Sequence, residues 1–159
     1  MRALIYTLGY EGLDIQTFIT LVRDEGISCV VDLRWTPWSR KSGFSKTALH
    51  QLLAANGIDY VPMPSLGSPR ELRQRLYQTR DWRTFADRYT MLLQQQGDAL
   101  AAIGRMASRM TVGLLCFEAN ARRCHRSLVM EALASVAGEE FQWRDLSKDG
   151  LKTLGCSLR

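Results

Sequence analysis

The stretch Ser28-Cys-Val-Val-Asp-Leu33 is nearly all apolar, as expected for a strand of a parallel sheet that helices cover on both faces. Comparable short runs occupy residues 3–8, 58–63, 111–117 and 141–146. Segments with the apolar spacing of helices lie between them, at 14–25, 45–55 and 121–137. Asp14, Ser45 and Asn120 are the expected N-caps. This alternation predicts an α/β fold, a Rossmann-like three-layer sandwich with a five-stranded, mainly parallel sheet.

A long helical insertion is expected between strands three and four. It covers about 69–106, and a break near Thr79–Asp81 divides it into two helices. The winding of the sheet is expected to reverse at this connection, which gives the strand order 3-2-1-4-5. The ligand crevice of such a sheet lies at the carboxyl ends of the strands beside the reversal. This places the candidate site in residues 9–12, 32–40 and 116–126.

The composition indicates a single soluble domain over residues 1–159. Hydrophobic residues make up 46% of the chain and charged residues 23%, as in ordinary globular proteins. The four cysteines have no regular spacing, so we expect reduced thiols and a cytoplasmic protein. The first apolar run ends at Gly9, too early for a signal peptide, and no run approaches the roughly 20 apolar residues of a membrane span.

Arginine dominates the basic residues. Lys and Arg number 21 against 16 Asp and Glu, and 17 of the 21 are arginine. Because the guanidinium group forms paired hydrogen bonds with phosphate or carboxylate, an anionic partner is suggested. A codon preference for arginine as a solubilising residue explains the same composition.

Polar residues follow three of the predicted strands. Gly9, Glu11 and Gly12 follow the first strand; Asp32, Arg34, Ser39 and Arg40 follow the second; Cys116, Glu118, Cys124, His125 and Arg126 follow the fourth. Asp32 and Arg34 alternate with Leu33, so both project to the same side, as an ion pair or as functional groups. Trp35 and Trp38 bracket Pro37 and line an aromatic pocket or form the loop's own core.

Three chemistries compete for the segment after strand four. Cysteine, glutamate and histidine are all zinc ligands, although the segment lacks a Cys-x-x-Cys pair. Cys116 and Arg122 have the Cys-x5-Arg spacing of thiol phosphatases, but Glu118 lies inside the expected anion cradle. The third reading is an anion site in which carboxylates act as general bases among arginines and His125 moves a proton.

The motifs resemble a known family, domain of unknown function 488 (DUF488). The matching residues run from 3 to 146 and are Thr7-Leu-Gly9-Tyr-Glu11, Val31-Asp32-Leu-Arg34, Pro37, Ser39, Arg40, Gly43-Phe44, Gly57-Ile58-x-Tyr60, Leu66-Gly67, Cys116-x-Glu118 and Cys124-His125-Arg126. The resemblance implies a soluble prokaryotic α/β protein and no particular activity. It adds Tyr60 and Gly67 to the candidate site. Glu11 stands where the family often has serine, which argues against a phosphate cradle at that turn.

A second basic region lies in the insertion. Residues 70–88 contain six arginines against three acidic residues, with Tyr77, Trp82 and Phe85 interleaved. Leu72, Leu76 and Tyr77 form one expected apolar stripe, and Phe85, Tyr89 and Leu92 another. Such a region is typical of a solvated helix face or of a surface that binds nucleic acid.

The favoured function is binding of a phosphorylated ligand, a nucleotide or a nucleic acid, followed by hydrolysis or transfer. The candidate catalytic residues are Glu118, Asp32, His125 and Cys116; the candidate binding residues are Gly9, Glu11, Arg34, Ser39, Arg40, Tyr60, Gly67, Cys124 and Arg126. No cofactor is assigned, and a divalent metal is left open. The alternatives are a non-catalytic nucleic-acid-binding module that uses the 70–88 surface and a thiol phosphatase-like enzyme that depends on Cys116. The expected partner is an anionic small molecule or nucleic acid, with no membrane.

Overall fold

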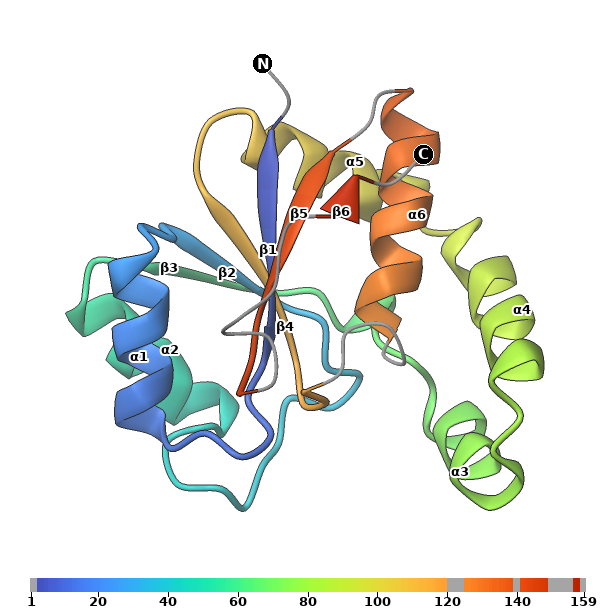
Figure 1. Cartoon of the computed structure of the whole chain (residues 1–159), viewed down its shortest axis with the longest axis horizontal. Coiled ribbons are helices and arrows are strands. Elements are labelled where there is room, and N and C mark those ends of the chain that lie inside the picture. The colour runs from blue at the N-terminus through green and yellow to red at the C-terminus, as the bar shows by residue number, and fades with distance from the viewer. Residues whose placement is uncertain (1–2, 120–124, 139–140, 149–155, 158–159) are drawn as a thin grey trace.

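A computed structural model describes residues 3–119, 125–138, 141–148 and 156–157 of the chain. Its sheet contains β1 (Leu4–Gly9), β2 (Cys29–Asp32), β3 (Asp59–Pro62), β4 (Val112–Cys116), β5 (Gln142–Leu146) and β6 (Cys156–Ser157). Strands β1 to β5 are parallel, and the two-residue β6 pairs antiparallel with β5. The sheet is open and helices cover both of its faces (Figure 1), which confirms the predicted α/β sandwich.

The order of the strands differs from the prediction. It is β3-β2-β4-β1-β5-β6, so the expected order 3-2-1-4-5 is wrong: β4 lies between β2 and β1. Every residue of β4 is buried, which suits the centre of the sheet, whereas the sequence alone does not distinguish β1 from β4 as the neighbour of β2. Because of this order, the carboxyl ends of β1, β4 and β2 lie side by side, where a ligand can contact all three.

Helices α1 (Ile15–Asp24) and α2 (Lys46–Ala55) cover one face of the sheet, and α5 (Gly97–Ala107) and α6 (His125–Ala137) cover the other (Figure 1). Two buried apolar clusters fill the layers between sheet and helices. Asp14 caps α1 by accepting a 2.7 Å hydrogen bond from the Thr17 amide. Ser45 stands at the N-cap of α2, but its side chain makes no capping hydrogen bond. The expected cap Asn120 lies outside the described residues.

The insertion contains three helices rather than the two that were expected: α3 (Arg70–Thr79), α4 (Trp82–Leu93) and α5. Arg80, with a φ of 57°, makes the predicted break. A second break falls at Gln94–Gln96 and divides the second expected helix into α4 and α5. A short 3-10 turn, Pro64–Leu66, precedes α3.

Helix α3 extends away from the sheet and contains no buried residue (Figure 1). The expected apolar stripes are therefore partly wrong: Tyr77 on α3 is 64% exposed and Leu92 on α4 is 37% exposed, whereas Phe85, Tyr89 and Leu93 are buried. On α3 only Tyr77 departs from the expected stripe: Leu72 and Leu76 are half-buried and pack against the core cluster, as expected. No helix in the described ranges has the length and apolar character needed to cross a membrane.

Candidate functional site

A small pocket, here called the site pocket, opens where β1, β2 and β4 end. Its volume is about 80 Å³. It is lined by Tyr10, Arg34, Trp35, Thr36, Trp38, Ser68, Arg73, Cys116, Phe117, Glu118 and His125. The location agrees with the expectation from topology, because the corrected strand order keeps β1 and β4 adjacent and adds β2 beside them.

Asp32 and Arg34 form a buried ion pair at the end of β2. The Arg34 Nη2 lies 2.7 Å from the Asp32 Oδ2, and the Arg34 Nε donates to both carboxylate oxygens. Asp32 is 1% exposed and Arg34 7%. The alternation around Leu33 therefore places the two side chains together, as expected.

The same ion pair organises its surroundings. Arg34 donates from Nη1 to the Phe44 carbonyl at 2.6 Å, which ties down the far end of the loop. Tyr60 donates its hydroxyl to the Asp32 Oδ2 at 2.5 Å. Burial alone would lower the pKa of Arg34, but the hydrogen bonds and charge of Asp32 outweigh burial and raise it. Burial and the Asp32 hydrogen bond raise the pKa of Tyr60. Asp32 and Tyr60 thus anchor the loop behind the pocket and do not line it.

The loop from Trp35 to Phe44 forms the rim of the pocket. The guanidinium of Arg40 lies 5.6 Å from the Trp38 ring centre, so Arg40 reaches the rim through this tryptophan. The Ser39 hydroxyl accepts a hydrogen bond from the Lys41 amide at 3.1 Å. Lys41 in turn donates from Nζ to the Tyr10 carbonyl at 3.0 Å. The loop is therefore fastened to the end of β1.

Two close approaches hold the strand-end loops together, and both require glycine. A Cβ on Gly9 would lie 2.1 Å from the Glu118 carbonyl oxygen, and a Cβ on Gly67 would lie 2.4 Å from the Trp35 amide nitrogen. Beside Gly9, the Glu11 carboxylate accepts a hydrogen bond from the Ala119 amide at 3.0 Å. Gly9, Glu11 and Gly67 therefore position the loops and do not line the pocket.

Cys116, Glu118 and His125, here called the trio, meet at the pocket. The Cys116 sulfur, a Glu118 carboxylate oxygen and a His125 ring nitrogen all lie within 4.8 Å of one another. Cys116 ends β4, and Glu118 follows two residues later in the loop after that strand. His125 opens the described part of α6. The trio brings together three of the four predicted catalytic residues.

Two contacts fix His125. Its Nε2 lies 3.0 Å from the Leu33 carbonyl oxygen. The ring also packs edge-on against Tyr89 of α4, with 5.7 Å between the ring centres, and the Tyr89 hydroxyl donates to the Leu66 carbonyl. Helix α4 thereby holds the histidine in place, a role that the sequence did not indicate.

Arg126 is completely buried beneath the loop that follows β4. Its Nη2 donates to the Glu118 carbonyl at 2.6 Å, and its Nη1 lies 3.5 Å from the Asp145 carboxylate. Asp145, at the end of β5, also accepts a 2.8 Å hydrogen bond from Thr7. Arg126 thus holds the backbone that carries Glu118. Cys124, predicted as a ligand residue, lies outside the described residues.

Arg73 is the charged residue of the pocket that the sequence did not single out. It comes from the exposed helix α3, yet its Nε is buried, and none of the described residues accepts a hydrogen bond from that nitrogen. The sequence placed Arg73 among the arginines at 70–88 and gave no signal to separate it from them. Ser68, 2% exposed and just before α3, was missed as well.

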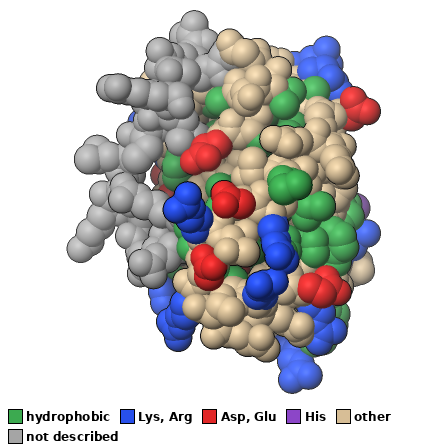
Figure 2. All heavy atoms as spheres, turned by 90° about the vertical axis from the view of Figure 1, so that its right-hand side faces the viewer, with side chains coloured by type: hydrophobic (Ala, Val, Ile, Leu, Met, Phe, Trp, Pro, Cys, Tyr) green, Lys and Arg blue, Asp and Glu red, His purple; other side chains and the backbone are tan. Residues whose placement is uncertain are grey.

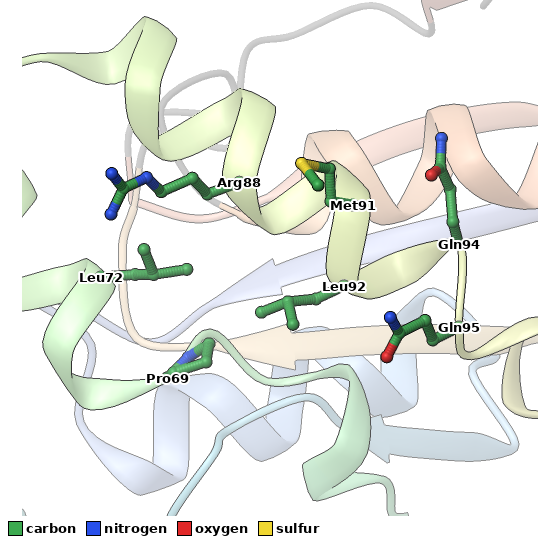
Figure 3. A pocket seen from close by; sticks show the side chains of 7 residues that line it. All are labelled: Pro69, Leu72, Arg88, Met91, Leu92, Gln94 and Gln95. Carbon is green, nitrogen blue, oxygen red and sulfur yellow. The ribbon is translucent and has the colours of Figure 1, made fainter.

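A larger cavity of about 450 Å³ lies between α3 and α4, away from the trio (Figure 3). Pro69 and Leu72 face Arg88, Met91 and Leu92 across it. Arg88 is its only titratable lining residue among those described. The larger cavity therefore lacks the groups that catalysis needs, in contrast to the smaller site pocket.

Comparisons with known proteins give one match. The family model "Domain of unknown function DUF488" matches residues 14–133. No curated protein and no solved structure matches the chain. The matched segment contains β2, β3, β4, the insertion and the whole trio. The resemblance noted from the motifs is thereby confirmed, and the chain belongs to the DUF488 family.

Proposed function

We propose that the site pocket binds the phosphate of a small phosphorylated ligand, with nucleotides as the favoured class, and that the protein hydrolyses this ligand or transfers its phosphoryl group. The observation that carries the proposal is the buried Arg73 Nε, which has no acceptor among the described residues. A buried donor left without a partner costs about 1–3 kcal/mol. An anionic ligand in the pocket would supply the acceptor, with Arg34 on the pocket wall as a second cation.

The size and rim of the pocket support a ligand with two parts. About 80 Å³ is far below the roughly 300–1,000 Å³ of sites that enclose a whole drug-sized ligand. The pocket has room for one compact anionic group. The remainder would lie against Trp35, Trp38 and Phe117, which are 44%, 64% and 44% exposed. A nucleobase stacks well on such rings, at about 1–3 kcal/mol per base.

The trio supplies the reacting groups. In hydrolysis, the oxygen of water bonds to phosphorus while the bond from phosphorus to the leaving oxygen breaks. Glu118 takes the proton of the attacking water, and the leaving oxygen takes a proton from solvent. Transfer follows the same course with an acceptor hydroxyl in place of water. The positive charges of Arg34 and Arg73 stabilise the negative charge on the phosphoryl oxygens.

A thermal-shift screen with nucleoside monophosphates and sugar phosphates tests binding. A ligand at 100 times its Kd adds about 2.7 kcal/mol of stability. Arg73→Gln should abolish the shift, whereas Arg75→Gln, an exposed arginine on the same helix, should keep it. Glu118→Gln should keep the shift and lose phosphate release. The proposal fails if no phosphorylated compound moves the midpoint, or if the two arginine variants behave alike.

The position of Cys116 favours a second candidate, a thiol phosphatase-like enzyme. A cysteine beside a histidine is the arrangement that activates a thiolate nucleophile, and both residues lie in the trio. Here His125 would take the thiol proton and the Cys116 sulfur would attack phosphorus while the bond from phosphorus to the leaving oxygen breaks, and the leaving oxygen would take a proton from solvent. Water would then hydrolyse the S–P bond, which releases phosphate and restores the thiol. This candidate predicts that Cys116→Ser abolishes turnover while Glu118→Gln leaves much of it.

The exposed arginines of α3 and α4 favour a third candidate, a nucleic-acid-binding module. Arg70, Arg75, Arg80, Arg83 and Arg88 are all exposed. Figure 2 shows, however, that acidic and apolar side chains interrupt the basic ones on the face that turns toward the viewer there. A module that reads the phosphate backbone loses affinity steeply as salt increases. Titration of single-stranded RNA and duplex DNA at low and high salt separates it from a small-ligand enzyme, which binds neither.

A further inference from the structure

The trio has the composition of a metal site with an open position. It combines a sulfur, a carboxylate oxygen and a ring nitrogen within 4.8 Å of one another. Tetrahedral Zn²⁺ with such ligands would place them roughly 3.3–3.6 Å apart. Small rotations of the Cys116 and Glu118 side chains would close the remaining gap while His125 keeps its contacts with Leu33 and Tyr89. All three residues line the site pocket.

The orientation of His125 suits a ligand. A carbonyl oxygen only accepts hydrogen bonds, so the 3.0 Å contact with Leu33 places the ring hydrogen on Nε2. The other nitrogen, Nδ1, then carries the lone pair. Histidines that bind metals almost always donate their second ring nitrogen to a carbonyl or carboxylate in this way, which fixes both the tautomer and the ring.

From these observations we propose that Cys116, Glu118 and His125 bind one divalent transition-metal ion, with Zn²⁺ as the best fit. A thiolate and an imidazole favour Zn²⁺ over Mg²⁺ or Ca²⁺, which take oxygen ligands. Thiolate and carboxylate together balance the two positive charges of the ion, so the occupied site is neutral beside Arg34 and Arg73. Three protein ligands leave a fourth position, which faces the pocket, as in catalytic zinc sites.

The ion deepens the proposed function, on which its catalytic role rests. A Zn²⁺-bound water loses a proton near neutral pH. Glu118 has two carboxylate oxygens, so one can bind the ion while the other accepts that proton. The phosphate, held by the arginines, would then meet a nucleophile already placed at the floor of the pocket. Metal binding itself needs no turnover and is tested separately.

The experiment measures metal binding to full-length protein that a chelator has stripped. Zn²⁺ is titrated in competition with a chromophoric chelator, and Co²⁺ is added in parallel because a cobalt–thiolate bond gives a charge-transfer absorption. We expect one equivalent of Zn²⁺ per chain and a cobalt–thiolate band. Cys116→Ser should abolish the band and weaken Zn²⁺ binding by more than the roughly 10–100-fold that loss of a residue hydrogen-bonded to a metal ligand costs. Glu118→Gln should weaken Zn²⁺ binding but leave the cobalt–thiolate band, because Cys116 is still present.

Cys29→Ala is the matched control, because Cys29 is a free, buried cysteine of the core outside the site pocket. It should keep both the stoichiometry and the band. Cys116→Asp, which replaces one zinc ligand by another, guards against a folding defect in Cys116→Ser and should restore part of the affinity. The metal proposal fails if wild-type protein does not bind Zn²⁺ or if Cys116→Ser binds it equally well.

The two proposals can fail independently. Phosphate release by protein that a chelator has fully stripped would overturn the catalytic role of the ion and leave the proposed function standing. Tight Zn²⁺ binding without any effect of phosphorylated ligands would do the reverse.

Discussion

The site pocket and helices α3 and α4 (Arg70–Thr79 and Trp82–Leu93), here called the arm, place their arginines in opposite environments. Arg34 and Arg126 at the strand ends are 7% and 0% exposed, and each forms an ion pair with an aspartate. Most arginines of the arm lie in solvent. Arg73 belongs to both regions, since it arises from the arm and reaches the pocket. The difference shows that the place of an arginine in the fold, rather than the number of arginines, determines whether it forms a buried ion pair or lies in solvent.

The largest effect is expected from removing a buried arginine. Arg34→Leu leaves the Asp32 carboxylate charged and 1% exposed, without its cation. Breaking a buried pair from one side costs about 3–5 kcal/mol, and urea unfolding should register that loss. Arg83→Leu on the exposed arm should change the free energy of unfolding by no more than about 0.5 kcal/mol. If both variants lost similarly little free energy of unfolding, the buried and exposed arginines would not differ in their contribution to stability.

A smaller effect is expected where the loops touch. Gly9→Ala places a methyl group 2.1 Å from the Glu118 carbonyl oxygen, so the backbone must move. Overpacking of this kind costs about 1–3 kcal/mol, and because Glu118 shifts, Zn²⁺ affinity should fall with it. Gly97→Ala, at the start of α5 with nothing within 4 Å of the added group, is the control. It should leave both quantities unchanged or raise stability by up to about 1 kcal/mol. Equal losses in the two variants would show that the close contact at Gly9 is not required.

The smallest effect concerns alkaline pH. The pKa of Tyr60 is raised by burial and by its hydrogen bond to Asp32, so the folded state holds this proton more tightly than the unfolded state. The associated stability is complete below the unfolded pKa of about 10 and is lost as pH rises through the folded pKa. Tyr60→Phe should therefore flatten the decline in the free energy of unfolding above about pH 10. Urea unfolding of the Tyr60→Phe variant and of the wild-type protein at a series of pH values compares the two declines. An unchanged decline in Tyr60→Phe would contradict the assignment.

Much of the fold and part of the site could be predicted from local sequence. The alternating strands and helices gave the fold class, and the strand ends gave Arg34, Cys116, Glu118 and His125, all of which line the pocket. The fold class is confirmed because it depends on residues close together in the chain, and the grouping of these four side chains at one pocket follows from the same local order. The order of the strands could not be derived in this way, because two fully apolar strands are equally suited to the centre of a sheet.

The missed residues share a cause. Arg73, Ser68 and Tyr89 reach the site only through the path of the insertion, and helical periodicity does not determine that path. The same gap explains Tyr77, whose apolar spacing is that of a buried residue although α3 leaves it exposed. The sequence placed Asp32 and Arg126 at the candidate site. Their hydrogen bonds to Tyr60 and to the Glu118 carbonyl show that both residues anchor loops, a role that the sequence alone did not distinguish from ligand binding.

The central place of β4 has a consequence for how the protein folds. A nascent chain that has emerged only as far as α5 contains β1 and β2 but not the strand that lies between them. Both strands then have unpaired edges, which are the surfaces that promote aggregation. Pairings between residues far apart in sequence, such as Ile5 with Val112, form slowly because they close large loops. Insertion of β4 is thus the step that joins the sheet, and the site pocket forms only after that strand has paired with β1 and β2.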